Sequence, residues 1–168
     1  MARRPTNAAE RPRAPAESID ALSFGALRSL AENPEASPQT LALLSRDPLL
    51  DVRVAVAWNP RTPATALARL ADGPVEVQAG VAQNPAASAE VLGRLAMHAD
   101  TMVRSATATN PRLPLPLLLV LAQDHEAVVR RHVARNRRVP YGVLVALTQD
   151  PDPEVRRTAE DGVRAWEG

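Results

Sequence analysis

An Asn-Pro dipeptide recurs along this chain of 168 residues at nearly constant intervals. It stands at Asn33, Asn59, Asn84 and Asn110, spaced 26, 25 and 26 residues apart, and Asn136 continues the series with arginine in the proline slot. Two leucine columns keep the same register, eight and eleven residues after each asparagine, and all five units fill both. Agreement in so many columns identifies a tandem repeat, and a period of about 20 to 50 residues is typical of solenoids and related arrays.

Each unit is predicted to form two short helices. The first begins at the Ser or Pro four residues after the asparagine, because Ser caps free amides and Pro suits the first helical turn. The second carries Val-Arg-x-Ala-Val-Ala, as in residues 52–57, and Asn-Pro ends it because the residue before proline leaves the helical region. Helices this short are unstable alone, so neighbouring units must stack to bury their apolar stripes.

The repeat frame divides the chain into four segments. We expect residues 1–17, rich in Arg, Pro and Ala, to be a disordered arm, 18–32 an N-terminal capping helix, 33–157 five repeat units and 158–168 a C-terminal cap. No apolar run reaches the roughly 18 residues of a membrane span, and the N-terminus lacks the apolar stretch of a secretory signal. We therefore expect a cytoplasmic protein, and the absence of Lys beside abundant Arg, Ala and Pro is typical of GC-rich bacterial genes.

Units of the form Asn-Pro-x-x-Pro-x-x-x-Leu-x-x-Leu-Ala-x-Asp-Pro-x-x-x-Val-Arg-x-Ala-Val-Ala resemble the leucine-rich repeat variant family, over residues 33–159. The resemblance implies an all-α fold, a right-handed α-solenoid of about five two-helix repeats of 25–26 residues, with 3₁₀ form as an option for one helix per unit. Other helical repeats such as HEAT are the near alternative. Some family members carry an N-terminal iron–sulfur module, but this chain has no Cys, so no cofactor is expected.

The asparagine column has two interpretations. Stacked amides can bind a ligand, whereas at a tight turn each amide satisfies backbone groups, often in the neighbouring unit. We favour the structural interpretation. It covers Asn33, Asn59, Asn84, Asn110 and Asn136.

An arginine follows the valine of the second helix in four of the five units, with Gln78 in the remaining one. These residues are Arg53, Arg104, Arg130 and Arg156. One position per unit maps to one line along a solenoid, so a ridge of guanidinium groups is predicted, which suits phosphates or an acidic partner. The alternative is an internal ion ladder with acids of the inter-helix turns, and the sequence favours the ladder while leaving the ridge open.

Residues 130–141 concentrate positive charge, although the formal net charge of the whole chain is only +1. This segment holds Arg130, Arg131, Arg135, Arg137, Arg138 and His132, with no acidic residue. The two interpretations are a solvated surface and a contact with an anion or a nucleic-acid backbone. Only Tyr141 offers an aromatic ring there, so recognition of single-stranded bases is disfavoured.

Trp58 stands in a column otherwise filled by polar side chains, so it is a candidate anchor for a partner, whereas Trp166 is expected to pack over the last unit. Catalysis has little basis in the sequence. The seven glycines are isolated, and the three histidines lie in different units without metal or catalytic spacing. We therefore expect neither an enzyme nor a metal site.

These observations favour a non-enzymatic scaffold that binds another protein along an extended solenoid face. The candidate contacts are Arg53, Trp58, Arg104, Arg130, Arg131, Arg135, Arg137 and Arg138. Binding of a nucleic-acid backbone through residues 130–138 and self-assembly through the end faces stay open as alternatives, and no membrane contact is expected.

Overall fold

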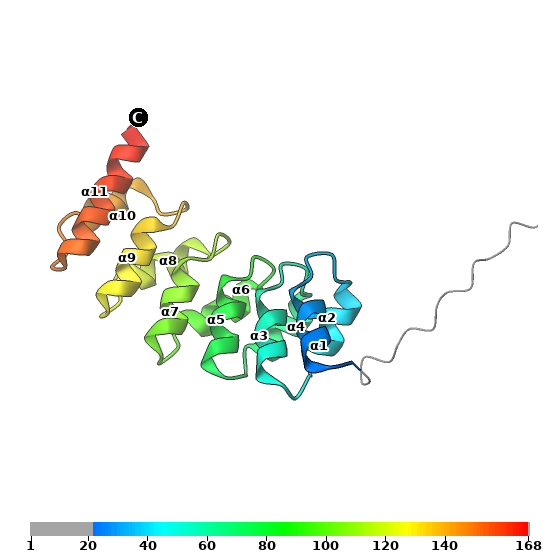
Figure 1. Cartoon of the computed structure of the whole chain (residues 1–168). Coiled ribbons are helices and arrows are strands. Elements are labelled where there is room, and N and C mark those ends of the chain that lie inside the picture. Colours follow the sequence, from blue (N-terminus) through cyan, green and yellow to red (C-terminus); the bar gives the residue numbers. More distant parts are fainter. Residues whose placement is uncertain (1–21, 168) are drawn as a thin grey trace, which may run out of the picture.

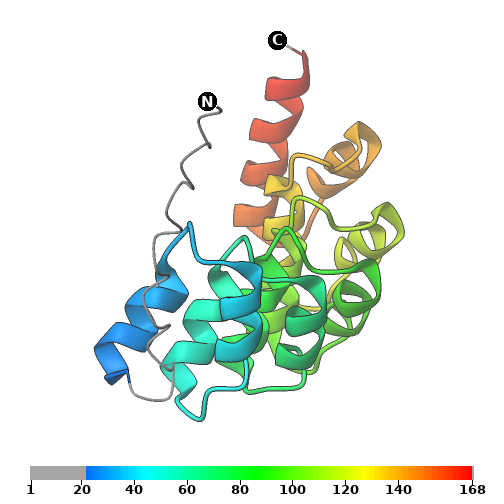
Figure 2. The same cartoon turned by 90° about the vertical axis from the view of Figure 1, so that its right-hand side faces the viewer.

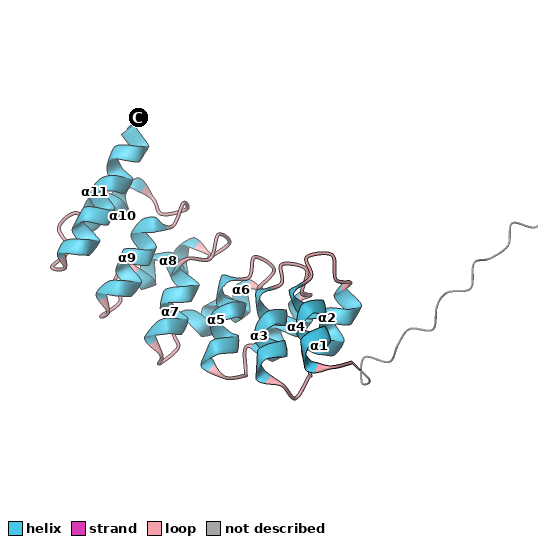
Figure 3. Cartoon of the chain, in the orientation of Figure 1, coloured by secondary structure: helices cyan, strands magenta, loops and turns pink. Residues whose placement is uncertain are grey.

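A computed structural model describes residues 22–167 of the chain (Figure 1). The predicted arm at residues 1–17 and the start of the predicted capping helix lie outside this range. Within it the chain forms eleven helices and no strand (Figure 3), which confirms the all-α prediction. The odd-numbered helices are α1 (Phe24–Glu32), α3 (Leu50–Trp58), α5 (Val75–Gln83), α7 (Thr101–Ala108), α9 (Ala127–Arg135) and α11 (Pro153–Glu167). The even-numbered helices are α2 (Pro38–Leu44), α4 (Ala64–Leu70), α6 (Ala89–Ala96), α8 (Leu115–Leu121) and α10 (Tyr141–Leu147).

The helices form an elongated solenoid with α1 at one end and α11 at the other (Figures 1 and 2). Each odd-numbered helix packs side by side with the next odd-numbered helix, from α1 on α3 through α9 on α11. The even-numbered helices make a second layer, and each contacts the odd-numbered helices on both sides of it in sequence. All helices of the described part are α-helices, so the 3₁₀ form that the family resemblance allows is not adopted there.

The predicted start and stop residues occupy the helix ends. Ser37 and Ser88 precede α2 and α6, and each hydroxyl accepts a hydrogen bond from the amide three residues on, at 3.1 and 3.2 Å. Asn59, at the end of α3, has the extended backbone (ψ 122°) that stops a helix before proline. Asn136 has the same conformation (ψ 125°) although Arg137 follows it, so proline is not required for the stop.

The core consists of the leucine and valine columns. All ten leucines of the two columns are buried, and the five valines of the second-helix column are fully buried. The leucines are Leu41, Leu44, Leu67, Leu70, Leu92, Leu95, Leu118, Leu121, Leu144 and Leu147. Each such side chain contributes about 2 kcal/mol by leaving water. Because these contacts join neighbouring units, the solenoid is stabilised by stacking.

The last helix runs without a break across residue 157, where the predicted C-terminal cap begins. A Cβ on Gly162 would lie 2.9 Å from Leu144 Cδ2, so glycine lets α11 approach α10 closely. Near its end, the Trp166 ring meets the Tyr141 ring edge to face, with centroids 6.2 Å apart. No helix within residues 22–167 has the length and apolar character needed to cross a bilayer.

Candidate partner-binding face

The asparagine column connects successive units through buried hydrogen bonds. The Nδ2 group of Asn84 donates to the carbonyls of Ala57 and Asn59 in the preceding unit, both at 2.8 Å. Its Oδ1 accepts from the amide of Ala86 at 2.9 Å, which fixes the following turn. The same three-bond arrangement recurs at Asn59, Asn110 and Asn136. Asn33, at the first joint, is exposed and accepts one bond from the amide of Glu35.

The arginine column is also turned inward. Arg104 makes a bidentate ion pair with Asp124 of the next unit, with Nε to Oδ2 at 2.7 Å and Nη2 to Oδ1 at 3.1 Å. Its Nη1 donates to the carbonyls of His98 and Ala99, which close the preceding turn. Arg130 repeats this arrangement with Asp150. The internal ladder therefore describes these two arginines.

The ladder is buried and shifts the ionisation of its members. The side chains of Arg104 and Asp124 are only 7% and 6% exposed. Burial opposes ionisation of Asp124, but the hydrogen bonds from Arg104 and from the Glu126 amide outweigh it and hold the Asp124 pKa below its ordinary value. The hydrogen bond from Arg130 likewise lowers the pKa of Asp150. These carboxylates stay charged throughout the neutral range.

The predicted arginine ridge is therefore corrected at all four of its positions. Arg104 and Arg130 direct their guanidinium groups to acids and carbonyls of this chain. Arg53 donates from Nη1 to the carbonyls of Asp47 and Pro48, at 2.8 Å each. Arg156 donates from Nη1 to the carbonyls of Asp150 and Pro151, at 2.7 and 2.9 Å. The physical reason is that an arginine at this position reaches backbone carbonyls of the turn before its own helix that have no other hydrogen-bond donor within the described residues. The contact satisfies the guanidinium group and these carbonyls together.

Much of the solvent-facing surface of α1, α3, α5, α7 and α9 comes from positions eight, five and one residues before each joint asparagine. Such spacing places side chains on one side of a helix. We call this surface the odd-helix face. Its members include Arg28, Glu32, Asp51, Val54, Trp58, Glu76, Gln83, Met102, Ser105, Thr109, Val128, Arg131 and Arg135.

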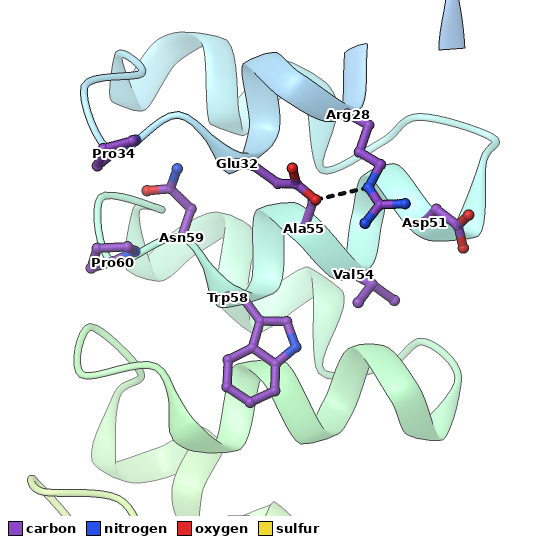
Figure 4. Close-up of a pocket in the computed structure, with 9 residues that line it drawn as sticks. All are labelled: Arg28, Glu32, Pro34, Asp51, Val54, Ala55, Trp58, Asn59 and Pro60. Carbon is purple, nitrogen blue, oxygen red and sulfur yellow. Dashed lines mark hydrogen bonds and ion pairs between the residues drawn. The ribbon is translucent and has the colours of Figure 1, made fainter. Parts of the chain in front are cut away.

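A groove of about 440 Å³ opens on this face between α1 and α3 (Figure 4). Trp58 lines it and is 49% exposed, as expected for a candidate anchor. Glu32, Asp51 and Val54 contribute further walls, and prolines of two joints border the groove. We call it the Trp58 groove.

The indole of Trp58 is held in place by α5. A Cβ on Gly80 would lie 3.1 Å from both Cδ1 and Nε1 of the indole and 2.9 Å from Ala57 Cβ. The ring edge therefore lies against the helix at the point where glycine leaves room for it. The ring is thus rigidly supported along the edge that carries Cδ1 and Nε1, and about half of the side chain stays exposed beside the groove. Both properties are typical of interface anchors.

The Trp58 groove carries an excess of negative charge. Arg28 donates from Nε to Glu32 at 2.7 Å, and this hydrogen bond raises the pKa of Arg28. Asp51 has no ion pair within residues 22–167, and Glu76, at the equivalent position of α5, has none there either. One end of the odd-helix face is thus aromatic and acidic.

A second groove of about 450 Å³ lies on the same face between the ends of α7 and α9. Arg135, Arg137 and Arg138 line it together with His132 and Thr109. All three arginines are exposed, and within the described part of the chain none has a carboxylate partner. We call it the arginine groove.

The two grooves occupy equivalent places in the repeat. Trp58 and Arg135 each stand one residue before a joint asparagine, and Asn59 and Asn136 form part of the two linings. The repeat therefore forms a groove at the same place in two joints, and the lining is aromatic and acidic in one and basic in the other. The sequence places Trp58 and Arg135 in the same column, but it does not show that each lines a groove.

The predicted basic cluster is divided by the fold. Arg130 belongs to the internal ladder, and Arg131 lies in a smaller hollow with Asp152 and Glu154 beside α11. Only Arg135, Arg137 and Arg138 meet in one groove. The cause is helical geometry, because residues one apart on a helix point in different directions.

His132 is one of the residues that line the arginine groove, and it is anchored from the neighbouring helix. Its Nδ1 lies 2.6 Å from the hydroxyl of Ser105 on α7. Burial is the largest cause that lowers its pKa, and the charges of Arg131 and Arg135 lower it further. The imidazole is therefore neutral at pH 7.

No protein-family model and no curated protein matches the chain. The chain is similar to a solved structure described as a leucine-rich repeat variant with a novel repetitive protein structural motif. The sequences are 33% identical, the TM-score is 0.56, and the match covers 80% of this chain and 58% of that one. The chain thus spans little more than half the length of that relative.

The fold and the joint geometry define a class, the helical-repeat solenoid. Within this class, the similarity confirms the resemblance to the leucine-rich repeat variant family that the repeat unit indicates. A repeat fold of this kind suggests a scaffold-type role.

Proposed function

We propose that the chain is a non-enzymatic scaffold that binds an extended segment of another protein along the odd-helix face. The observation that carries this proposal is the Trp58 groove, where a half-exposed indole is held over Gly80. An exposed aromatic ring on a rigid support loses little conformational entropy on binding, which is why such residues dominate interface energetics. The equivalent arginine groove extends the same surface along the solenoid.

Binding of a nucleic-acid backbone is the competing function. The three unpaired arginines of the arginine groove favour it. A nucleic acid is negative along its whole length, however, and Asp51 and Glu76 would repel it farther along the odd-helix face. A protein segment can change its charge along its length, so it suits both ends of the face.

Panning of a random 15-residue peptide library on the immobilised full chain tests the proposal. We expect enriched peptides that bind wild type and lose about 30-fold in affinity on Trp58→Ala, the scale of a tryptophan hot spot. Trp166→Ala is the matched control, because Trp166 is also exposed but lies on the distant α11. Peptides that bind all three proteins equally, or no enrichment at all, would overturn the proposal.

A further inference from the structure

The two grooves of the odd-helix face carry opposite unpaired charge. In the Trp58 groove, two carboxylates face one guanidinium group, and Asp51 is left without an ion pair in the described part. In the arginine groove, three guanidinium groups and a histidine have no carboxylate among the lining residues. Between them, α7 presents Met102 and Ser105, which carry no charge. The face is therefore polarised along the solenoid axis.

We propose that the bound segment is an extended, charge-polarised peptide whose acidic side chains occupy the arginine groove and whose basic side chain occupies the Trp58 groove. This inference rests on the proposed function and names the chemistry of its partner. A guanidinium or ammonium group can stack on the half-exposed indole of Trp58, and the excess of carboxylates over guanidinium groups among the lining residues attracts it to this groove. Carboxylates gain bidentate contacts from the guanidinium groups of Arg135, Arg137 and Arg138.

The repeat also sets the spacing of the two charges on the peptide. The grooves are separated by three steps between neighbouring odd-numbered helices, α3 to α5, α5 to α7 and α7 to α9. Packed helices lie about 8–10 Å apart, so the separation is about 24–30 Å. An extended chain advances about 3.3 Å per residue. The basic and acidic residues of the peptide should therefore stand about eight residues apart.

The charge pattern of enriched peptides tests this directly. In a 15-residue library panned on wild type, we expect an Arg or Lys about eight residues from a Glu or Asp pair. Arg137→Glu should weaken such a peptide about tenfold, because reversal replaces attraction by repulsion. Replacing one acidic residue of the peptide by arginine should recover part of the lost affinity, because the variant groove then offers one carboxylate beside the guanidinium groups of Arg135 and Arg138. The control is Arg46→Glu, another exposed turn arginine with no carboxylate partner in the described residues, which should bind like wild type.

The outcomes separate this inference from the proposed function. Peptides that need Trp58 but tolerate Arg137→Glu would overturn the charge-polarised partner and leave the scaffold function standing. Uniformly acidic peptides that ignore Trp58→Ala, or displacement by a duplex DNA oligonucleotide with a steep salt dependence, would overturn both and favour nucleic acid. Arg137 is exposed and its side chain makes no hydrogen bond within residues 22–167, so the variant should fold, as its helical circular dichroism would show.

Discussion

Replacing Asn84 by alanine should destabilise the solenoid by about 3 kcal/mol. The side chain makes three hydrogen bonds, two from Nδ2 to the carbonyls of Ala57 and Asn59 and one to Oδ1 from the amide of Ala86. Each such bond is worth about 1 kcal/mol net. Asn84 is only 2% exposed, so water cannot easily replace these partners. The loss is large against a typical total of about 5–15 kcal/mol for a domain.

Guanidinium unfolding followed by helical circular dichroism measures the difference. Asn33→Ala is the matched control, because the exposed Asn33 accepts a single bond, from the amide of Glu35 at 2.8 Å. We expect the control to lose about 1 kcal/mol. Equal losses for Asn84→Ala and Asn33→Ala would refute the account of the joint. An Asn84→Ala variant that unfolds like wild type but no longer binds peptides would instead favour the ligand-binding interpretation of the column.

The buried ion pair, the arginine groove and the support of Trp58 can each be tested by one substitution. Asp124→Ala should cost about 3–5 kcal/mol in unfolding free energy, since it leaves the Arg104 charge buried, whereas Asp72→Ala, which removes an exposed ion pair, should cost less than about 1 kcal/mol. The pKa of His132 is lower in the folded chain than in the unfolded chain, so below about pH 6.5 the unfolded chain binds a proton more readily. The free energy of unfolding should therefore fall as the pH drops below that value. Denaturation measured at several pH values should show no such loss in His132→Gln. Gly80→Ala should displace the indole beside it, shift the tryptophan emission and cost about 1–3 kcal/mol by overpacking.

The repeat period made most of the fold predictable. Fixed columns of leucine and valine determine which faces are buried, and Ser, Pro and Asn-Pro determine where each helix begins and ends. These signals are local, so they can be read from one unit and checked against four others. The sequence does not reveal that residues 153–167 form one continuous helix, because the change of pattern at residue 158 alters the exposed side and leaves helix propensity intact.

Whether the arginines of the column face inward or toward solvent depends on the geometry between neighbouring units, which the sequence of one unit does not contain. The sequence nevertheless holds a signal for the ladder. Asp124 and Asp150 stand 20 residues after Arg104 and Arg130, and the residue 20 after Gln78 is His98. At Gln78 both members of the pair are thus absent, whereas Arg53 is followed at the same distance by Gly73 and, within the described residues, donates only to the carbonyls of its own turn. Such paired loss is expected when two side chains neutralise each other across a joint, because either one alone would be costly to bury.

The candidate binding site depends on a column whose residues vary from unit to unit. The position before each joint asparagine holds Glu32, Trp58, Gln83, Thr109 and Arg135 in turn, although the neighbouring positions hardly change. This side chain is not needed to close the joint, because the hydrogen bonds come from the asparagine and the buried packing from the alanine before it, although Trp58 also rests on Gly80. The stability of the fold therefore does not restrict the residue type at this position, and the requirements of binding can determine it. Exchanging Trp58 and Arg135 should for the same reason change which peptides bind far more than it changes the free energy of unfolding, whereas a change in the asparagine column should do the reverse.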